Sequence, residues 1–193
     1  MVLACCDSSD TNDEKSEMKS LILFSGGIDS AVCAYGADNP LLVCFDYGQA
    51  HYIEIRYAEA IAKRLELNLI IEQLPKISKP DGLVYSGRNL LLISAAIPIA
   101  VEHGANEIII GCNKSDAENF PDCQPTFIDW VNVAIKAGGY GVAVRAPLIK
   151  MEKGQVIELA DEVGLNLAET WSCYNPIDSK PCGECLACQG RRL

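Results

Sequence analysis

The sequence lacks any apolar run long enough to cross a membrane. The longest, Leu90 to Val101, spans about twelve residues and is interrupted by Ser94 and Pro98, whereas a membrane-spanning helix needs roughly twenty. The stretch from Met1 to Cys6 is too short for the apolar part of a secretory signal and continues directly into acidic residues. We therefore expect no membrane association and a cytoplasmic protein.

Basic residues are also scarce. The 193 residues include 16 Lys and Arg against 26 Asp and Glu, so the formal net charge is -10. The longest basic run is Arg191-Arg192. Since a chain this acidic repels phosphodiester backbones, we expect a small-molecule substrate and no nucleic-acid partner. A hydrophobic content of 49% over this length supports one domain with a substantial core.

Short apolar runs alternate with helical patterns from Ser20 onward, after an acidic segment, 1–18, that we expect to be a disordered tail. Strands are predicted at 21–24, 41–45, 69–71, 107–111 and 142–144, and helices from about 29 and over 51–67, 88–103, 126–137 and 153–163. Fully apolar strands that alternate with helices indicate an α/β fold with a doubly wound, mostly parallel five-stranded sheet. Such sheets bind ligands beyond the carboxyl ends of their strands. The chemistry is therefore expected in the loops at 25–30, 46–49 and 112–125.

The first of these loops has the features of a phosphate site. It reads Ser25-Gly26-Gly27-Ile28-Asp29-Ser30, between a strand and a helix. The glycines let backbone N–H groups face an anion, the helix N-terminus adds partial positive charge, and both serines can donate hydrogen bonds. Asp29 is expected either to help hold Mg²⁺ or to cap the helix. The pattern is neither a Walker A motif nor a dinucleotide fingerprint, and the alternative is an ordinary tight turn.

Four of the ten cysteines are close together near the C-terminus: Cys173, Cys182, Cys185 and Cys188. Four thiolates suit a closed, structural zinc site. An iron–sulfur cluster is the alternative, although the downstream Cys-Pro of the ferredoxin run is missing. A disulfide framework is more typical of small secreted scaffolds. The expected organisation is therefore a nucleotide-binding domain over 19–170 and a zinc-binding segment over 171–193.

Several motifs together resemble the 7-cyano-7-deazaguanine synthase family of queuosine precursor biosynthesis, within the PP-loop ATP pyrophosphatase superfamily. The similarity covers about Lys19 to Cys188 and rests on Phe24–Ser30, Phe45–Gln49, Gly87–Asn89, Phe120–Gln124, Ala146–Leu148 with Lys153, and Trp171–Asn175. Only the first motif is shared widely among PP-loop enzymes. The resemblance implies zinc on the four cysteines and a homodimer.

The reaction implied by the resemblance consumes ATP and ammonia. ATP with Mg²⁺ is expected on Phe24 to Ser30. The carboxylate of 7-carboxy-7-deazaguanine then becomes an acyl adenylate, ammonia displaces AMP, and a second activation of the amide leaves the nitrile. The expected catalytic residues are Asp29, Ser30, Arg88 and Lys153, the last two as cations that stabilise phosphate charge rather than ordinary surface cations.

The resemblance also indicates a substrate pocket, for which the alternative is plain loop packing. Tyr47 or Phe120 is expected to stack on the deazapurine, and Asp116 and Asp122 to accept from its guanine-like donor edge. The remaining expected contacts are Gln49, Asn89 and Cys123. A loop cysteine carries a persulfide in sulfur-transferring PP-loop enzymes, but the Pro-Asp-Cys-Gln context of Cys123 favours the nitrile-forming family. His51 and His103 are expected to be incidental.

Two other functions stay open at this point. A PP-loop tRNA sulfurtransferase requires an RNA-binding module and a basic face, and the sequence shows neither. A non-catalytic deazapurine- or nucleotide-binding module is the other alternative, because the stretch 74–87 is shorter than in the family.

Overall fold

A single parallel sheet forms the centre of the fold. The computed structural model describes residues 19–49, 51–76 and 87–191. Its strands are β1 (Ser20–Leu23), β2 (Leu41–Asp46), β3 (Leu69–Gln73), β4 (Glu107–Ile109) and β5 (Ala143–Arg145), in the order β3-β2-β1-β4-β5. Every neighbouring pair is parallel. The five predicted strands and the α/β class are confirmed, and the expected tail, 1–18, lies outside the described residues.

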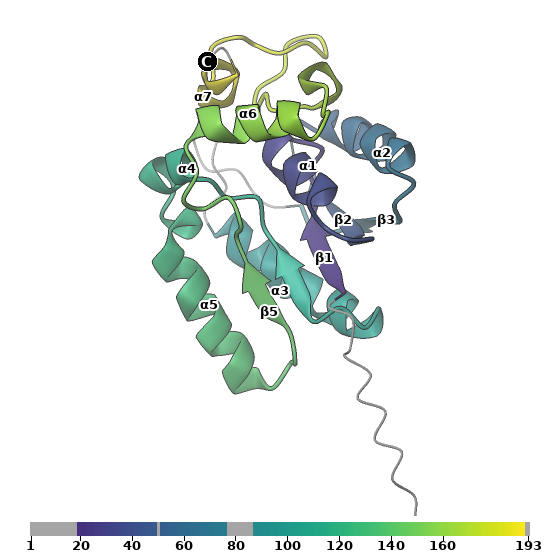
Figure 1. The fold of residues 1–193 in the computed structure, drawn as a ribbon, viewed down its shortest axis with the longest axis vertical. Helices are drawn as coiled ribbons and strands as arrows, with labels where there is room; N and C mark the ends of the chain where they lie inside the picture. The colour runs from purple at the N-terminus through teal and green to yellow at the C-terminus, as the bar shows by residue number, and fades with distance from the viewer. Residues whose placement is uncertain (1–18, 50, 77–86, 192–193) are drawn as a thin grey trace, which may run out of the picture.

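Helices cover both faces of the sheet (Figure 1). On one face lie α1 (Ile28–Tyr35), α2 (Glu54–Arg64) and α6 (Lys153–Glu162), and on the other α3 (Arg88–Glu102) and α5 (Pro125–Gly138). Successive strand residues point to opposite faces, so Ile22 packs against the first group of helices and Leu21 against the second. The doubly wound arrangement follows from these two apolar layers.

The strand order reverses at β1. The chain moves outward from β1 to β3 and then returns to place β4 on the other side of β1. The loops after β1 and β4 therefore diverge at the carboxyl ends of their strands, where α/β proteins bind ligands. The fold therefore has a switch point at the edge of the sheet where the sequence predicted the site.

Four short helical elements were not predicted. They are α4 (Lys114–Asn119), η1 (Pro121–Cys123), η2 (Leu167–Glu169) and α7 (Leu186–Gly190). The first two lie in the segment expected to be a loop after β4. Neither contains enough apolar residues for a helical period, and α4 is held instead by a capping box between Asn113 and Asp116. Figure 1 shows α4, α6 and α7 gathered at one end of the sheet.

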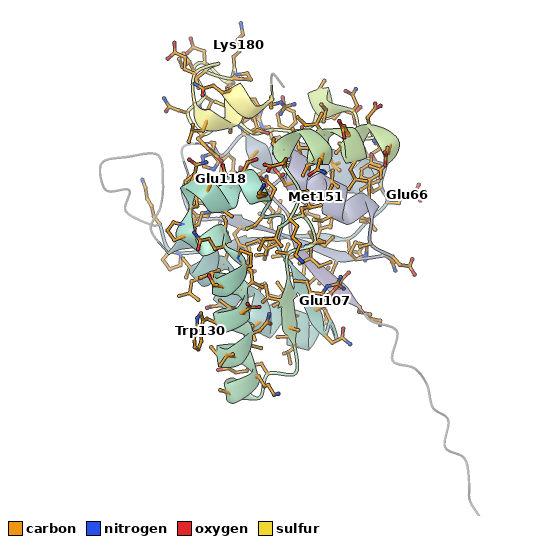
Figure 2. The ribbon with its side chains drawn as sticks, turned by 60° about the vertical axis from the view of Figure 1, so that its left-hand side comes forward. Glu66, Glu107, Glu118, Trp130, Met151 and Lys180 are labelled. Atoms are coloured by element: carbon orange, nitrogen blue, oxygen red, sulfur yellow. The ribbon has the colours of Figure 1, made fainter. Side chains whose placement is uncertain are left out.

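The outer surface of α5 is partly apolar. Figure 2 shows Trp130 projecting from this helix, and its side chain is 72% exposed. None of the helices in the described ranges has both the length and the apolarity that a membrane crossing requires.

Candidate functional site

A cavity of about 380 Å³ opens at the carboxyl ends of the central strands. Phe24 follows β1, Phe45 belongs to β2, and Ile110 to Cys112 follow β4, and all of them line it. This volume lies in the range of small-molecule sites. The cavity thus coincides with the loops in which the sequence placed the chemistry.

The glycine loop enters the cavity wall in a conformation that requires Gly26. Its φ is +74°, and a Cβ there would lie 2.5 Å from the backbone nitrogen of Ala58. Gly27 is the N-cap of α1, so Asp29 lies in the first turn and does not cap the helix. Ser30 Oγ donates to the carbonyl of Gly27 at 3.1 Å. The loop is thus pressed against α2, with the N-terminus of α1 directed at the cavity.

Asp29 is held by two partners from distant parts of the chain. Lys153 Nζ donates to one carboxylate oxygen at 2.6 Å and Asn113 Nδ2 to the other at 2.9 Å. Asn113 is fully buried and also caps α4, where its Oδ1 accepts from the backbone of Asp116 at 3.0 Å. Burial, followed by the charge of Asp29, raises the pKa of Asp116. The glycine loop, α4 and the start of α6 are therefore linked at one point.

Arg88 lies in the cavity wall rather than on the outer surface. Burial acts to lower its pKa, but Tyr47, Tyr174 and Glu54 outweigh that effect, and the pKa is raised. Tyr47 also shares a side-chain hydrogen bond with it. Arg88 is therefore a positioned cation that faces two phenol rings at the start of α3.

Gln49 organises the loop after β2 instead of lining the cavity that the described residues outline. Its Oε1 accepts from the backbone of Tyr47 at 2.9 Å, and its Nε2 donates to the carbonyl of Phe45 at 3.1 Å and to Glu54 Oε1 at 3.0 Å. His51 Nε2 lies 3.4 Å from the same Glu54 oxygen. Burial raises the pKa of Glu54 from 4.5 to about 7.

Asn89, Asp122 and Cys123 meet at the junction of α3 and η1. The amide nitrogen Nδ2 of Asn89 donates to the carbonyl of Asp122 at 3.1 Å and to Cys123 Sγ at 3.3 Å. A hydrogen bond with Cys123, together with burial, raises the pKa of Cys112. These contacts fix the cavity wall where substrate contacts were expected.

The four C-terminal cysteine sulfurs come together. All lie within 4.8 Å of one another, and Cys182 Sγ is 3.5 Å from Cys173 Sγ and 3.9 Å from Cys188 Sγ. Backbone N–H groups of Glu184 and Cys185 donate to Cys182, which lowers its pKa to about 6. All four are free thiols. This donor set suits a metal ion bound by thiolates.

The cysteine segment also forms part of the cavity wall. The backbone N–H of Trp171 donates to the carbonyl of Gly26 at 2.9 Å, and the indole packs against Tyr57 of α2. Leu186, Ala187 and Gly190 of α7 line the cavity. A metal held by the four cysteines would therefore stabilise one side of the pocket.

Most of the sequence-predicted residues line this cavity. They are Phe24, Ser25, Gly27, Asp29, Ser30, Tyr47, Arg88, Asn89, Asp116, Phe120, Asp122, Cys123 and Lys153. Ile28 points into the core. Sequence reasoning missed Glu54 and Tyr174 and set His51 aside, although all three line the cavity. The spacing of His51 and Glu54, one turn apart after the β2 loop, was the available signal.

Solved structures with similar folds include proteins of varied activity. A U34-tRNA thiolase from Methanococcus maripaludis superposes with a TM-score of 0.55 at 16% identity, over 90% of this chain and 63% of its own. An NH3-dependent NAD synthetase from Campylobacter jejuni gives 0.52 at 18% identity, over 82% and 68%. At these identities the likeness shows the fold alone.

Sequence comparison is more specific. The family model described as queuosine biosynthesis protein QueC matches residues 19–193. The 7-cyano-7-deazaguanine synthase of Leptospira biflexa is 34% identical over 220 residues, covering 90% of this chain and 89% of its own. That of Clostridium acetobutylicum is 35% identical over 204 residues, covering 90% and 91%. Both alignments are longer than this chain of 193 residues, so the relatives carry insertions. With the fold, the glycine loop and the cysteine cluster all in place, the chain belongs to the queuosine biosynthesis protein QueC family.

Proposed function

We propose that this chain converts 7-carboxy-7-deazaguanine and ammonia to 7-cyano-7-deazaguanine, with release of AMP and pyrophosphate. The observation that carries the proposal is the cavity, which brings the glycine loop together with Tyr47 and Phe120 in a chain of this family. ATP activates the carboxylate as an acyl adenylate, ammonia replaces AMP, and a second ATP activates the amide oxygen so that its loss leaves the nitrile.

The phosphate loop is the proposed ATP site. The backbone around Gly27 and the hydroxyls of Ser25 and Ser30 offer donors to phosphate oxygens. Lys153, which lies 2.6 Å from Asp29, is close enough to this loop to neutralise charge that develops on the α-phosphate. Asp29 then holds the lysine in place. The loop thus favours adenylation with pyrophosphate as the leaving group.

The deazapurine is proposed to occupy the part of the cavity between the β2 loop and η1. Tyr47 and Phe120 supply ring faces, and Asp116 and Asp122 supply acceptors for a guanine-like donor edge. Arg88 is proposed to bind the carboxylate before activation and the adenylate phosphate afterwards. Asn89 and Cys123 support this wall through their mutual hydrogen bond.

Mg²⁺ is proposed to arrive with ATP. Lys153 and Asn113 each donate to one oxygen of Asp29, and each oxygen keeps a second lone pair that could face the ion. When bound, the ion would neutralise phosphate charge.

Zinc is the metal proposed for the four cysteines. A tetrahedral zinc with bonds of about 2.3 Å places its sulfurs about 3.8 Å apart, close to the 3.5 and 3.9 Å separations around Cys182. An iron–sulfur cluster would hold the sulfurs farther apart, because several irons lie between them. The proposed zinc is structural, since four protein ligands complete its coordination. It would secure the segment 171–193 to the nucleotide-binding domain 19–170, in a chain that we propose to be a homodimer.

Mass spectrometry tests the proposed reaction. The purified protein is incubated with 7-carboxy-7-deazaguanine, ATP, Mg²⁺ and ammonium at neutral pH. Nitrile formation with AMP and pyrophosphate supports the proposal. Binding without turnover would favour the non-catalytic module, and ADP with orthophosphate in place of AMP would contradict adenylation.

A further inference from the structure

The ammonia step needs a proton acceptor in addition to the ATP site. Near neutral pH ammonium predominates in solution, and it has no lone pair with which to attack the activated carboxylate. A base beside the acyl adenylate is therefore required, placed where a small cation can reach it. This inference rests on the proposed function and deepens it.

Glu54 is a carboxylate in this position. It is the first residue of α2, it lines the cavity, and its side chain is 12% exposed. Its backbone carbonyl lies 2.9 Å from where a Cβ on Gly26 would sit, so the start of α2 touches the phosphate loop. A group at this point is next to the phosphates to which the substrate carboxylate becomes joined.

One oxygen of Glu54 is fixed and the other is available. Gln49 Nε2, at 3.0 Å, and His51 Nε2, at 3.4 Å, both contact Oε1. Gln49 is itself immobilised by the backbone of Phe45 and Tyr47. No described residue donates a hydrogen bond to Oε2, and this oxygen is not fully buried. Since Glu54 lines the cavity, we take Oε2 to be its accessible oxygen.

We propose that Glu54 binds ammonium through this oxygen and takes its proton, so that neutral ammonia is released beside the acyl adenylate. The ammonia lone pair forms the C–N bond, the bond between the acyl carbon and the phosphate oxygen breaks, and AMP leaves with that electron pair. The protonated amide then loses one proton to solvent. Glu54 then returns its own proton from Oε2 to water in the open cavity, which closes the cycle.

The charges around Glu54 are consistent with this task. Arg88 of α3 favours the ionised carboxylate, and His51 lies on the same loop. The Cys44 thiol of β2 also faces it, with a pKa that burial raises to about 12, so this thiol is neutral. With burial raising the pKa of Glu54 to about 7, the group can both take and release a proton near neutral pH.

The test separates the ammonia step from adenylation. Glu54→Gln keeps an acceptor for Gln49 but cannot take a proton. At pH 7 we expect kcat/KM for ammonia to fall roughly 100-fold or more, while pyrophosphate exchange that depends on 7-carboxy-7-deazaguanine stays within about threefold. Hydroxylamine, which is uncharged at this pH, should be used by the variant at a rate close to that of the parent, giving the hydroxamate and AMP. Glu54→Asp keeps a carboxylate and should retain intermediate ammonia activity.

Each of three results would overturn the proposal. The first is an unchanged kcat/KM for ammonia in Glu54→Gln. The second is an equal loss of exchange and of ammonia use, which indicates a structural role. The third is a raised KM for the deazapurine alone, which indicates that Glu54 reads the ring. If Glu54→Gln does not fold, the test uses Glu54→Asp instead. A ratio of ammonia rate to hydroxylamine rate equal to that of the parent then contradicts the proposal. Absence of exchange in the parent enzyme would instead contradict the proposed function.

Discussion

Replacing Gly26 by alanine should damage both stability and catalysis, for a reason visible in the backbone. The φ of +74° costs a non-glycine residue about 1–2 kcal/mol. The new Cβ would lie 2.5 Å from the nitrogen of Ala58 and 2.9 Å from the carbonyl of Glu54. Both are backbone atoms, so α2 must move by about an ångström, and such overpacking costs about 1–3 kcal/mol. The free energy of unfolding should fall by about 2–5 kcal/mol, which corresponds to a Tm lower by roughly 5–20 °C.

The assay combines thermal unfolding, followed by circular dichroism, with pyrophosphate exchange. Gly154→Ala is the matched control, because Gly154 lies within α6 and no atom is within 4 Å of its Cβ position. That variant should match or exceed the parent by about 0.5–1 kcal/mol. A Gly26→Ala protein with parental Tm and exchange rate would refute the argument that the loop needs glycine against α2.

Three further outcomes are expected. Asp29→Ala should reduce ATP–pyrophosphate exchange roughly 100-fold with little loss of fold, because Lys153 loses its anchor; wild-type exchange would remove Asp29 from the site. Elemental analysis should find about one zinc per chain. Cys185→Ser should lower both the zinc content and the Tm, whereas Cys33→Ala should leave the zinc content unchanged. A brown protein containing iron and sulfide would contradict the zinc assignment. Burial raises the pKa of Glu54 from 4.5 to about 7, so the free energy of unfolding of the parent falls as the pH rises through that range. Glu54→Gln lacks this titration, and in urea unfolding its stability relative to the parent should rise by about 1–3 kcal/mol between pH 5 and pH 8. Parallel pH curves for the two proteins would contradict the assignment.

The main elements of the fold could be predicted because their signals are local. A short apolar run followed by a glycine turn, such as Leu21 to Phe24, favours a buried strand, and the helical patterns between such runs indicate the covering helices. The glycine loop and the cysteine spacing are also local motifs, so a phosphate site and a metal site could be predicted from the sequence. These features together predicted a site at the end of the sheet where the cavity lies.

Contacts between distant segments could not be predicted in the same way. Nothing around Asn113 indicates that its amide reaches Asp29, since the contact depends on β4 lying beside β1. Gln49 was expected to contact substrate, but its amide is used within its own loop. Glu54 was overlooked because an acidic first residue is ordinary in a helix, and only burial distinguishes it. Short polar helices such as α4 give no apolar period at all.

The position of β1 in the sheet has a consequence for how the protein folds. Ser20 pairs with Glu107, and Gly111, just after β4, lies against the backbone of Asp29 and Ser30. The phosphate loop therefore cannot reach its final geometry until a contact of high sequence separation has closed, and such contacts form late and slowly. A nucleotide that binds only the completed loop acts on this last step. By mass action it should populate the folded state at the expense of species in which β4 is still undocked.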